Sequence, residues 1–228
     1  MSDHQPLTEL YPFLHGGRQD ADALRKALLE SVQHKAGDSV STKQRFFAEN
    51  GQAVVAVAEA VAGVYRRNGR MFSMGNGGSS CDASHFAVEF LHPVTAGRPA
   101  LTAVNLACDM AMVTAVGNDV GFGHIFLRQL IALARRGDGL IGFSTSGSSE
   151  NLLAAFAKAK EMGLVTIGLA GHDGGKMARS AGLDHCLVVA SDSIHRIQET
   201  HLATYHILWD LVHTLLAEDR GGLAEGQP

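Results

Sequence analysis

The chain has 228 residues, of which 46% are hydrophobic and 18% are charged, and its formal net charge at pH 7 is −4. This composition supports one full hydrophobic core, so we expect one folded domain with an appended helical segment and exclude a disordered chain. The small negative charge and the absence of a lysine or arginine run disfavour binding to nucleic acid or to an anionic membrane.

The cysteines and the N-terminal residues indicate the compartment. Cys81, Cys108 and Cys186 are far apart in the sequence and form no CxxC pair, which argues against a disulfide framework. The first ten residues, MSDHQPLTEL, lack the basic start and apolar core of a signal peptide, and no apolar run approaches the ~20 residues of a transmembrane helix. We therefore expect a reduced, soluble, cytoplasmic protein.

The first part of the chain predicts two helices. Residues 20–35 carry apolar side chains at helical spacing from Ala21 to Val32. A second helical pattern covers residues 42–68 and ends in arginines followed by a glycine, as helix C-termini favour. These helices pack either on another subunit or on each other, and the sequence does not decide between the two. We assign residues 1–69 to a helical segment used in oligomerisation.

From residue 70 onward, short apolar runs alternate with helical patterns. This succession predicts an α/β fold with a doubly wound parallel sheet and helices on both faces. Runs such as LIGFS, without polar alternation, are typical of strands buried on both sides. We expect this domain over residues 70–218 and a flexible tail over 219–228. The predicted strands cover residues 70–74, 101–105, 139–144, 164–170 and 184–190, and the predicted helices 79–91, 107–116, 123–135, 148–162, 175–181 and 193–217.

The loop after the first predicted strand reads GNGGSS, over residues 75–80. Glycines let the backbone approach a ligand closely, and the N–H groups that begin the next helix favour an anion. A tight turn with no ligand explains the same pattern about equally well. The spacing differs from the GxGxxG dinucleotide fingerprint, so a nicotinamide cofactor is disfavoured.

The loop after the third predicted strand reads STSGSSEN, over residues 144–151. Its hydroxyls and backbone N–H groups can together bind phosphate oxygens without a lysine. Because the chain has no Walker lysine, this loop indicates binding of a phosphate monoester rather than phosphoryl transfer. The alternative is a serine cluster that only caps a helix. Both loops follow strands of one parallel sheet, so we expect them to share one edge.

Titratable residues follow each other at helical spacing in two places. His85 and Glu89, four residues apart, lie on one helix face, which suits a metal or a base with an orienting neighbour, although such pairs are often surface ion pairs. On the last predicted helix, His201 and His206 are about 140° apart, so they cannot both face one site. The spacing does not tell which of these two histidines is structural.

Five segments together resemble one known family. They read GNGGSSCDASHFAVE, AVGNDVGF, STSGSSEN, DGGKMA and RIQETHLATYH, in this order between residues 70 and 216. This set resembles the sedoheptulose 7-phosphate isomerases, or phosphoheptose isomerases, of the sugar isomerase (SIS) domain superfamily. The resemblance implies a flavodoxin-like sheet of five strands, a homotetramer with sites at subunit interfaces, and aldose–ketose isomerisation by enediolate proton transfer. The implied reaction converts sedoheptulose 7-phosphate into D-glycero-D-manno-heptose 7-phosphate, in heptose biosynthesis for cell-surface polysaccharide.

The resemblance also implies roles for individual residues. Glu89 is the base that moves a proton between the first two sugar carbons, and His206 is the second acid/base group, which leaves His201 a structural role. One zinc ion per site would be held by His85, Glu89, Gln198 and His206. The implied phosphate contacts are Ser79, Ser144, Thr145, Ser146 and Ser149, and the implied sugar contacts are Asn76, Gly77, Gly78, Asn118 and Asp119 together with Glu89 and Gln198.

Two positions depart from the family pattern. After the catalytic helix, residues 91–94 read LHPV where the family has a substrate-facing arginine, and Arg98 is nearby but not aligned. A family aspartate is replaced by His195. Both positions touch substrate contacts, so the particular sugar phosphate stays open, as do the need for zinc and the number of subunits.

A rival function comes from the same fold. The initiator-associating protein of bacterial replication control resembles this chain but binds a protein partner, and it lacks acid/base residues at the positions of Glu89 and His206. A non-catalytic sugar-phosphate sensor would need the two phosphate loops but not Glu89. Because both acid/base residues are present here, we favour the enzyme.

Overall fold

The computed structural model describes the backbone of residues 21–221 and the side chains of residues 21–217. Contacts divide the chain into two units, residues 1–40 and residues 41–228. Residues 1–20 of the predicted N-terminal segment and residues 222–228 of the predicted tail lie outside the described residues. Within the described part, no helix has both the length and the apolar character needed to cross a membrane.

The two helices expected before the first strand are one helix, α2 (Ala21–Arg66). The segment between the two predictions contains Gly37 but no proline, and a helical glycine costs only about 1 kcal/mol relative to alanine. Long runs of helix-forming residues on both sides outweigh that cost. In the first unit, Leu28, Leu29 and Val32 are 58%, 59% and 65% exposed.

The second unit contains a five-stranded sheet in which every neighbouring pair is parallel. The strand order is β2-β1-β3-β4-β5, the flavodoxin-like order of a doubly wound fold, so the predicted fold class is confirmed. Strands β1 and β3 are buried throughout, as their apolar sequences predicted. The strands are β1 (Met71–Gly75), β2 (Ala103–Asn105), β3 (Gly139–Ser144), β4 (Val165–Gly171) and β5 (His185–Val189).

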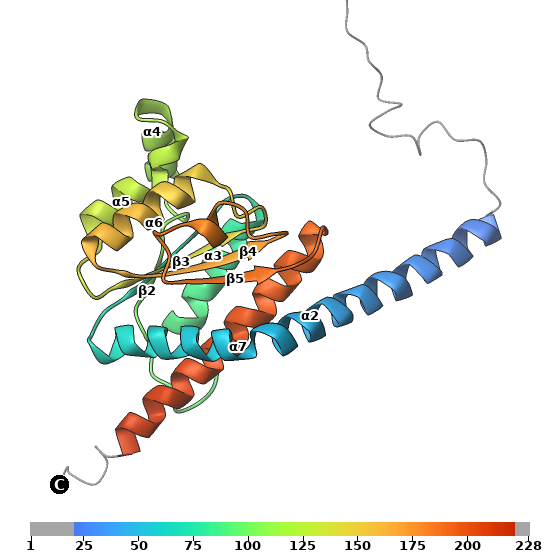
Figure 1. Ribbon diagram of the computed structural model, residues 1–228, viewed down its shortest axis with the longest axis horizontal. Helices are drawn as coiled ribbons and strands as arrows, with labels where there is room; N and C mark the ends of the chain where they lie inside the picture. The colour runs from blue at the N-terminus through green and yellow to red at the C-terminus, as the bar shows by residue number, and fades with distance from the viewer. Residues whose placement is uncertain (1–20, 222–228) are drawn as a thin grey trace, which may run out of the picture. The chain divides into compact units, whose positions relative to one another are not determined.

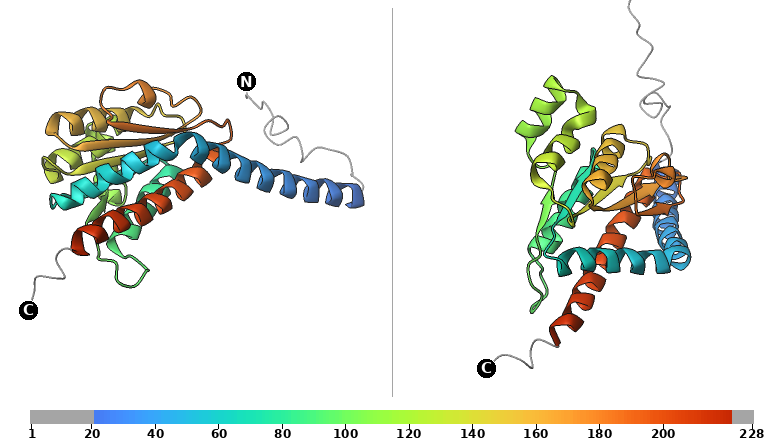
Figure 2. Two further views of the ribbon diagram at one scale, coloured as in Figure 1. Left: turned by 60° about the horizontal axis from the view of Figure 1, so that its bottom comes forward. Right: turned by 60° about the vertical axis from the view of Figure 1, so that its left-hand side comes forward.

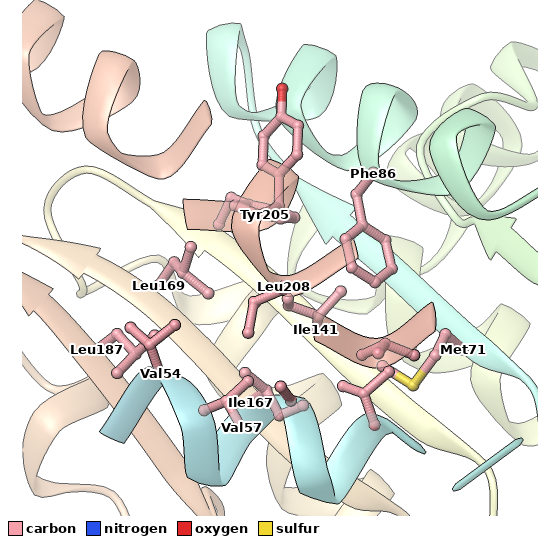
Figure 3. Close-up of a cluster of buried hydrophobic side chains, with 14 of the residues drawn as sticks. Val54, Val57, Met71, Phe86, Ile141, Ile167, Leu169, Leu187, Tyr205 and Leu208 are labelled. Carbon is pink, nitrogen blue, oxygen red and sulfur yellow. The ribbon is translucent and has the colours of Figure 1, made fainter. Parts of the chain in front are cut away.

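Helices cover both faces of the sheet (Figures 1 and 2). One apolar cluster joins the second half of α2 with α3 and α7, and the other joins α4, α5 and α6. Figure 3 shows the first cluster, where Val57 of α2, Phe86 of α3 and Leu208 of α7 gather over Ile141 and Ile167 of the sheet. These helices are α3 (Gly78–Leu91), α4 (Met110–Asp119), α5 (Ile125–Leu133), α6 (Glu150–Met162) and α7 (Ile194–Gly221), with short 3-10 turns η2 (Phe122–His124) and η3 (Met177–Arg179).

Two predicted helices differ from the observed elements for local reasons. Helix α4 starts later than expected because Asp109 caps it, its carboxylate accepting a hydrogen bond from Met112 N at 3.0 Å. The helix expected over residues 175–181 is only the turn η3. Its start is prevented by Gly174 and Gly175, which have φ angles of 81° and 52°, outside the right-handed helical region.

Candidate functional site

The two predicted phosphate loops lie side by side at the switch point of the sheet. The chain leaves β1 toward β2 on one side and returns to β3 on the other, and ligands of such sheets bind beyond the carboxyl ends of the strands at this point. Gly75 at the end of β1 is paired with Phe143 of β3. The loops that follow these two residues therefore open to the same place.

Serines and an asparagine line a small cavity between these loops. Its volume is about 110 Å³, well below the ~300 Å³ at which drug-sized sites begin, so it suits one small polar group. Helices α3 and α6 begin beside it, and the N-terminus of a helix favours an anion. The polar residues that line the cavity are Asn76, Ser79, Ser144, Thr145, Ser146 and Ser149.

Hydrogen bonds hold the two loops together. The side-chain amides of Asn76 and Asn151 exchange two hydrogen bonds, of 2.9 and 2.8 Å. The hydroxyls of Ser144 and Ser149 lie 3.1 Å apart, and Gly147 N donates to the Ser144 hydroxyl at 3.1 Å. Both hydroxyls are thus positioned before any ligand arrives.

The DGGKMA segment, residues 173–178, packs against the serine loop. Gly147 has a φ of 60°, and a Cβ there would lie 2.2 Å from the Gly174 carbonyl oxygen. Met177 N donates to the Gly147 carbonyl at 2.8 Å. Only glycine permits this approach, so the segment after β4 fixes the loop after β3.

The titratable cluster joins α3 and α7 of one chain. His85 Nε2 lies 2.9 Å from Glu89 Oε1, and the ring of His206 lies 4.9 Å from that of His85. One ligand atom from each of these three residues falls within 4.8 Å of the others. Two imidazoles and a carboxylate match the donor set of a catalytic metal site.

Two aromatic residues of α7 support this cluster. The Tyr205 hydroxyl lies 2.8 Å from His85 Nδ1, and its ring is buried in the apolar cluster while its hydroxyl points out of it (Figure 3). Trp209 Nε1 donates to the Glu89 carbonyl at 2.8 Å. The tyrosine therefore orients the imidazole, and the tryptophan fixes the backbone that carries the carboxylate.

The electrostatics of the cluster favour a neutral His206. Desolvation and, to a smaller extent, His85 lower the pKa of His206, while Glu89 opposes this change. A neutral imidazole can accept a proton or bind a metal. Beside the cluster, burial raises the pKa of Asp82 to about 6 against the effect of His85, and Asp82 Oδ2 is buried without a hydrogen-bond partner among the described residues.

The structure separates the two histidines that the helical spacing left open. His201 is fully buried, and its Nε2 lies 3.2 Å from the Ala170 carbonyl of β4. Burial lowers the pKa of His201 to about 4, against the opposing effect of that hydrogen bond. His201 thus belongs to the core, and His206 joins the cluster on the other side of α7.

The remaining predicted residues lie at different distances from the site. A Cβ at Gly78 would lie 2.4 Å from Gln198 Nε2, so Gln198 meets the start of α3, next to Gly77. Asn118 and Asp119 are exposed at the end of α4, where Asn118 Nδ2 donates to Asp119 Oδ1 at 2.8 Å. These two residues do not line the serine cavity and do not belong to the titratable cluster.

The structure also shows where residues at or near the two positions that depart from the family pattern lie. Arg98 stacks on the Trp209 ring, with its guanidinium carbon 4.3 Å from the ring centroid, and donates to Asp210 Oδ1 at 2.6 Å. Arg98 thus packs on Trp209 and is not one of the residues of the titratable cluster. His195 is exposed near the start of α7.

Sequence reasoning did not assign a role to four residues near the site, of which three lie inside the quoted segments and one follows the last of them. A signal for one was available, because Gln198 and Tyr205 are seven residues apart and share a face of α7. The contact between the two asparagine amides depends on tertiary structure and has no sequence signal. The four residues are Asp82, Asn151, Tyr205 and Trp209.

This chain is similar in sequence and in fold to known proteins. Residues 36–171 match the SIS domain family. A phosphoheptose isomerase of Desulfovibrio desulfuricans is 40% identical over 88% of this chain and 95% of its own length. The structure of a phosphoheptose isomerase from Francisella tularensis matches with a TM-score of 0.78 and 34% identity, over 82% of this chain and 98% of that one. A phosphoheptose isomerase from Neisseria gonorrhoeae matches with a TM-score of 0.76 and 37% identity, over 82% and 99%.

Proposed function

Because the chain belongs to the phosphoheptose isomerases, a family of SIS-domain proteins, we propose that it isomerises sedoheptulose 7-phosphate to D-glycero-D-manno-heptose 7-phosphate. One observation carries the proposal: helix α3 begins in the serine cavity with Ser79 and carries His85 and Glu89 further along. At 1.5 Å per residue, Ser79 and His85 are about 9 Å apart along the helix axis. A sugar chain held by its phosphate at one end can thus reach the titratable cluster with the other.

The serine loops anchor the phosphate in this proposal, and the chemistry is a proton transfer at the far end of the sugar. The Glu89 carboxylate removes a proton from C1 of the ketose and returns it to C2, through an enediolate. The neutral His206 imidazole accepts the proton of the C1 hydroxyl and delivers it to the oxygen on C2. The C1 hydroxyl becomes the aldehyde and the C2 ketone becomes a hydroxyl, so atoms and charge balance.

The same cluster of side chains suits a bound metal ion. His85, Glu89 and His206 supply two imidazoles and a carboxylate within 4.8 Å, and Gln198 is the fourth ligand that the family resemblance implies. Nitrogen and oxygen donors without cysteine suit zinc at a catalytic site. A bound zinc ion supplies a Lewis acid that stabilises negative charge on the sugar oxygens. The Tyr205 hydroxyl holds the His85 ring in the orientation that this ligand set needs.

The alternative functions receive less support. A sugar-phosphate sensor or a partner of a replication initiator has no need for an acid/base pair, yet Glu89 and His206 meet in one cluster. Relatives that are about 40% identical over most of this chain are phosphoheptose isomerases. The tetramer and the shared sites remain predictions from the resemblance, and light scattering of the purified protein tests the first of them. The cytoplasmic location remains a prediction from the cysteines and the N-terminal residues.

The experiment is an isomerase assay over phosphorylated sugars of five to seven carbons. The protein is assayed after chelation and again with added zinc, with unphosphorylated sedoheptulose as the control. We expect turnover of the seven-carbon phosphate, little or none of the unphosphorylated sugar, and a rate increase with zinc. Binding of a sugar phosphate without turnover in either metal state would overturn the proposal in favour of a sensor.

A further inference from the structure

A second cavity lies at the amino edge of the sheet, opposite the serine loops. Its volume is about 680 Å³, within the range of small-molecule sites. Three connections form it, from α2 to β1, from α5 to β3 and from α6 to β4, near the cyan end of α2 in Figure 1. Among the described residues, this arginine pocket is lined by Arg67, Arg70, Arg135 and Arg136 together with one acidic residue, Asp138.

Asp138 neutralises only one of these arginines. Its carboxylate accepts hydrogen bonds from Arg70 N and Arg70 Nη2, both at 2.9 Å, and from Arg135 N at 2.8 Å. With an exposure of only 4%, it is held inside the turn and does not face the cavity freely. Among the described side chains, no carboxylate forms an ion pair with the guanidinium of Arg67, Arg135 or Arg136. Three positive charges therefore remain uncompensated.

The backbone beneath the arginine pocket is closely packed. A Cβ at Gly69 would lie 2.7 Å from the Gly137 carbonyl oxygen, and Gly137 N donates to the Gly163 carbonyl at 3.1 Å. Gly163 has a φ of 80°, and a Cβ there would lie 3.2 Å from Cγ of Arg136. These contacts hold the three turns together, so the arginine side chains extend from a closely packed backbone.

We propose that the arginine pocket binds a small molecule with two or more phosphate groups, at a site separate from that of the sugar substrate. Guanidinium groups bind phosphate oxygens in bidentate fashion, and three of them exceed the need of one phosphate monoester. Four of the 19 basic residues of a chain with net charge −4 line this one cavity, so overall charge does not explain the cluster. Among the described residues, no nucleophile lines the cavity, and the Asp138 carboxylate is engaged, so we infer that the ligand is bound and not converted.

The test is calorimetric titration of the full chain with inorganic tripolyphosphate at about 0.1 M salt. We expect saturable binding of one tripolyphosphate per chain. The variant Arg135→Gln/Arg136→Gln should bind about tenfold more weakly or worse, with Arg67→Gln as a second, independent variant. The matched control Arg128→Gln removes one charge from an exposed position of α5 that does not line the cavity, and should bind within twofold of the unchanged chain.

A second control separates the two phosphate sites. Ser149→Ala changes the serine cavity at the opposite edge and should leave tripolyphosphate affinity unchanged. Absence of saturable binding, equal weakening by Arg128→Gln, or weakening by Ser149→Ala alone would each overturn the arginine pocket. Because isomerase activity is assayed separately, failure of this site is distinguishable from failure of the proposed isomerase function.

Discussion

The Tyr205 hydroxyl lies 2.8 Å from Nδ1 of His85, while Nε2 of the same imidazole lies 2.9 Å from Glu89 Oε1. Both ring nitrogens are therefore engaged, and the hydroxyl can donate to Nδ1 or accept from it. It can therefore serve either tautomer of His85. Burial raises the pKa of Tyr205, so the phenol stays protonated and neutral at physiological pH.

Tyr205→Phe should lower kcat about tenfold with little change in KM. The substitution keeps the buried ring but removes the partner that orients His85, and the loss of such a partner costs about 10- to 100-fold in activity or metal affinity. Steady-state kinetics measure kcat and KM, and zinc titration against a chelator measures the metal affinity. Tyr65→Phe is the matched control, because the Tyr65 hydroxyl donates to the Thr102 carbonyl away from the cluster. Equal kcat and zinc affinity in Tyr205→Phe and the unchanged chain would contradict this role.

Ser149→Ala should raise KM about tenfold and change kcat little. The Ser149 hydroxyl lines the serine cavity and meets that of Ser144, and a hydrogen bond to a charged group contributes roughly 1.5–3 kcal/mol. Ser148→Ala is the control within the same loop, since Ser148 does not line the cavity and accepts a hydrogen bond from Lys176 N. The role of the loop as phosphate site is wrong if both variants show the same KM.

Asp82→Asn should stabilise the fold above about pH 6 and lose this advantage below about pH 4. The pKa of Asp82 is raised by burial from 3.8 to about 6, so between these values the folded state binds more protons than the unfolded state. Stability from this group therefore falls as pH rises through that window. The asparagine removes the penalty, on the order of 2 kcal/mol.

Chemical denaturation of both chains at pH 4, 6 and 8 measures this prediction. Val88→Ala, at an exposed position of the same helix, controls for unrelated changes in α3. A difference between Asp82→Asn and the unchanged chain that is constant across the three pH values would exclude Asp82 as the source of the pH dependence.

The sheet followed from the sequence because its strands are short, apolar and bounded by glycine or polar loops. Local signals failed where tertiary or backbone effects dominate. The break expected near Gly37 is absent because a glycine weakens a helix only slightly. The helix expected after residue 174 is reduced to a turn by two glycines with positive φ. Propensity alone does not report either outcome.

Part of the site could be predicted from the sequence, because local spacing links some of its residues. Residues of one loop or one helix face, such as His85 and Glu89, are linked by spacing alone. The choice between His201 and His206 required knowing which side of α7 meets the sheet, and the structure buries His201 there. The partnership of Tyr205 with His85 joins residues 120 apart in sequence, and no local pattern encodes it.

The central claim is that Glu89 transfers the proton, and the direct measurement pairs turnover with binding in Glu89→Gln. Trp209 bonds the backbone carbonyl of residue 89 and not its side chain, so the helix should keep its place. Metal content is measured in parallel, and Glu59→Gln, at an exposed position of α2, is the matched control. We predict that Glu89→Gln loses about 10²-fold or more in turnover of sedoheptulose 7-phosphate while its calorimetric affinity for the sugar phosphate stays within about threefold. Turnover equal to that of the unchanged chain would contradict the claim.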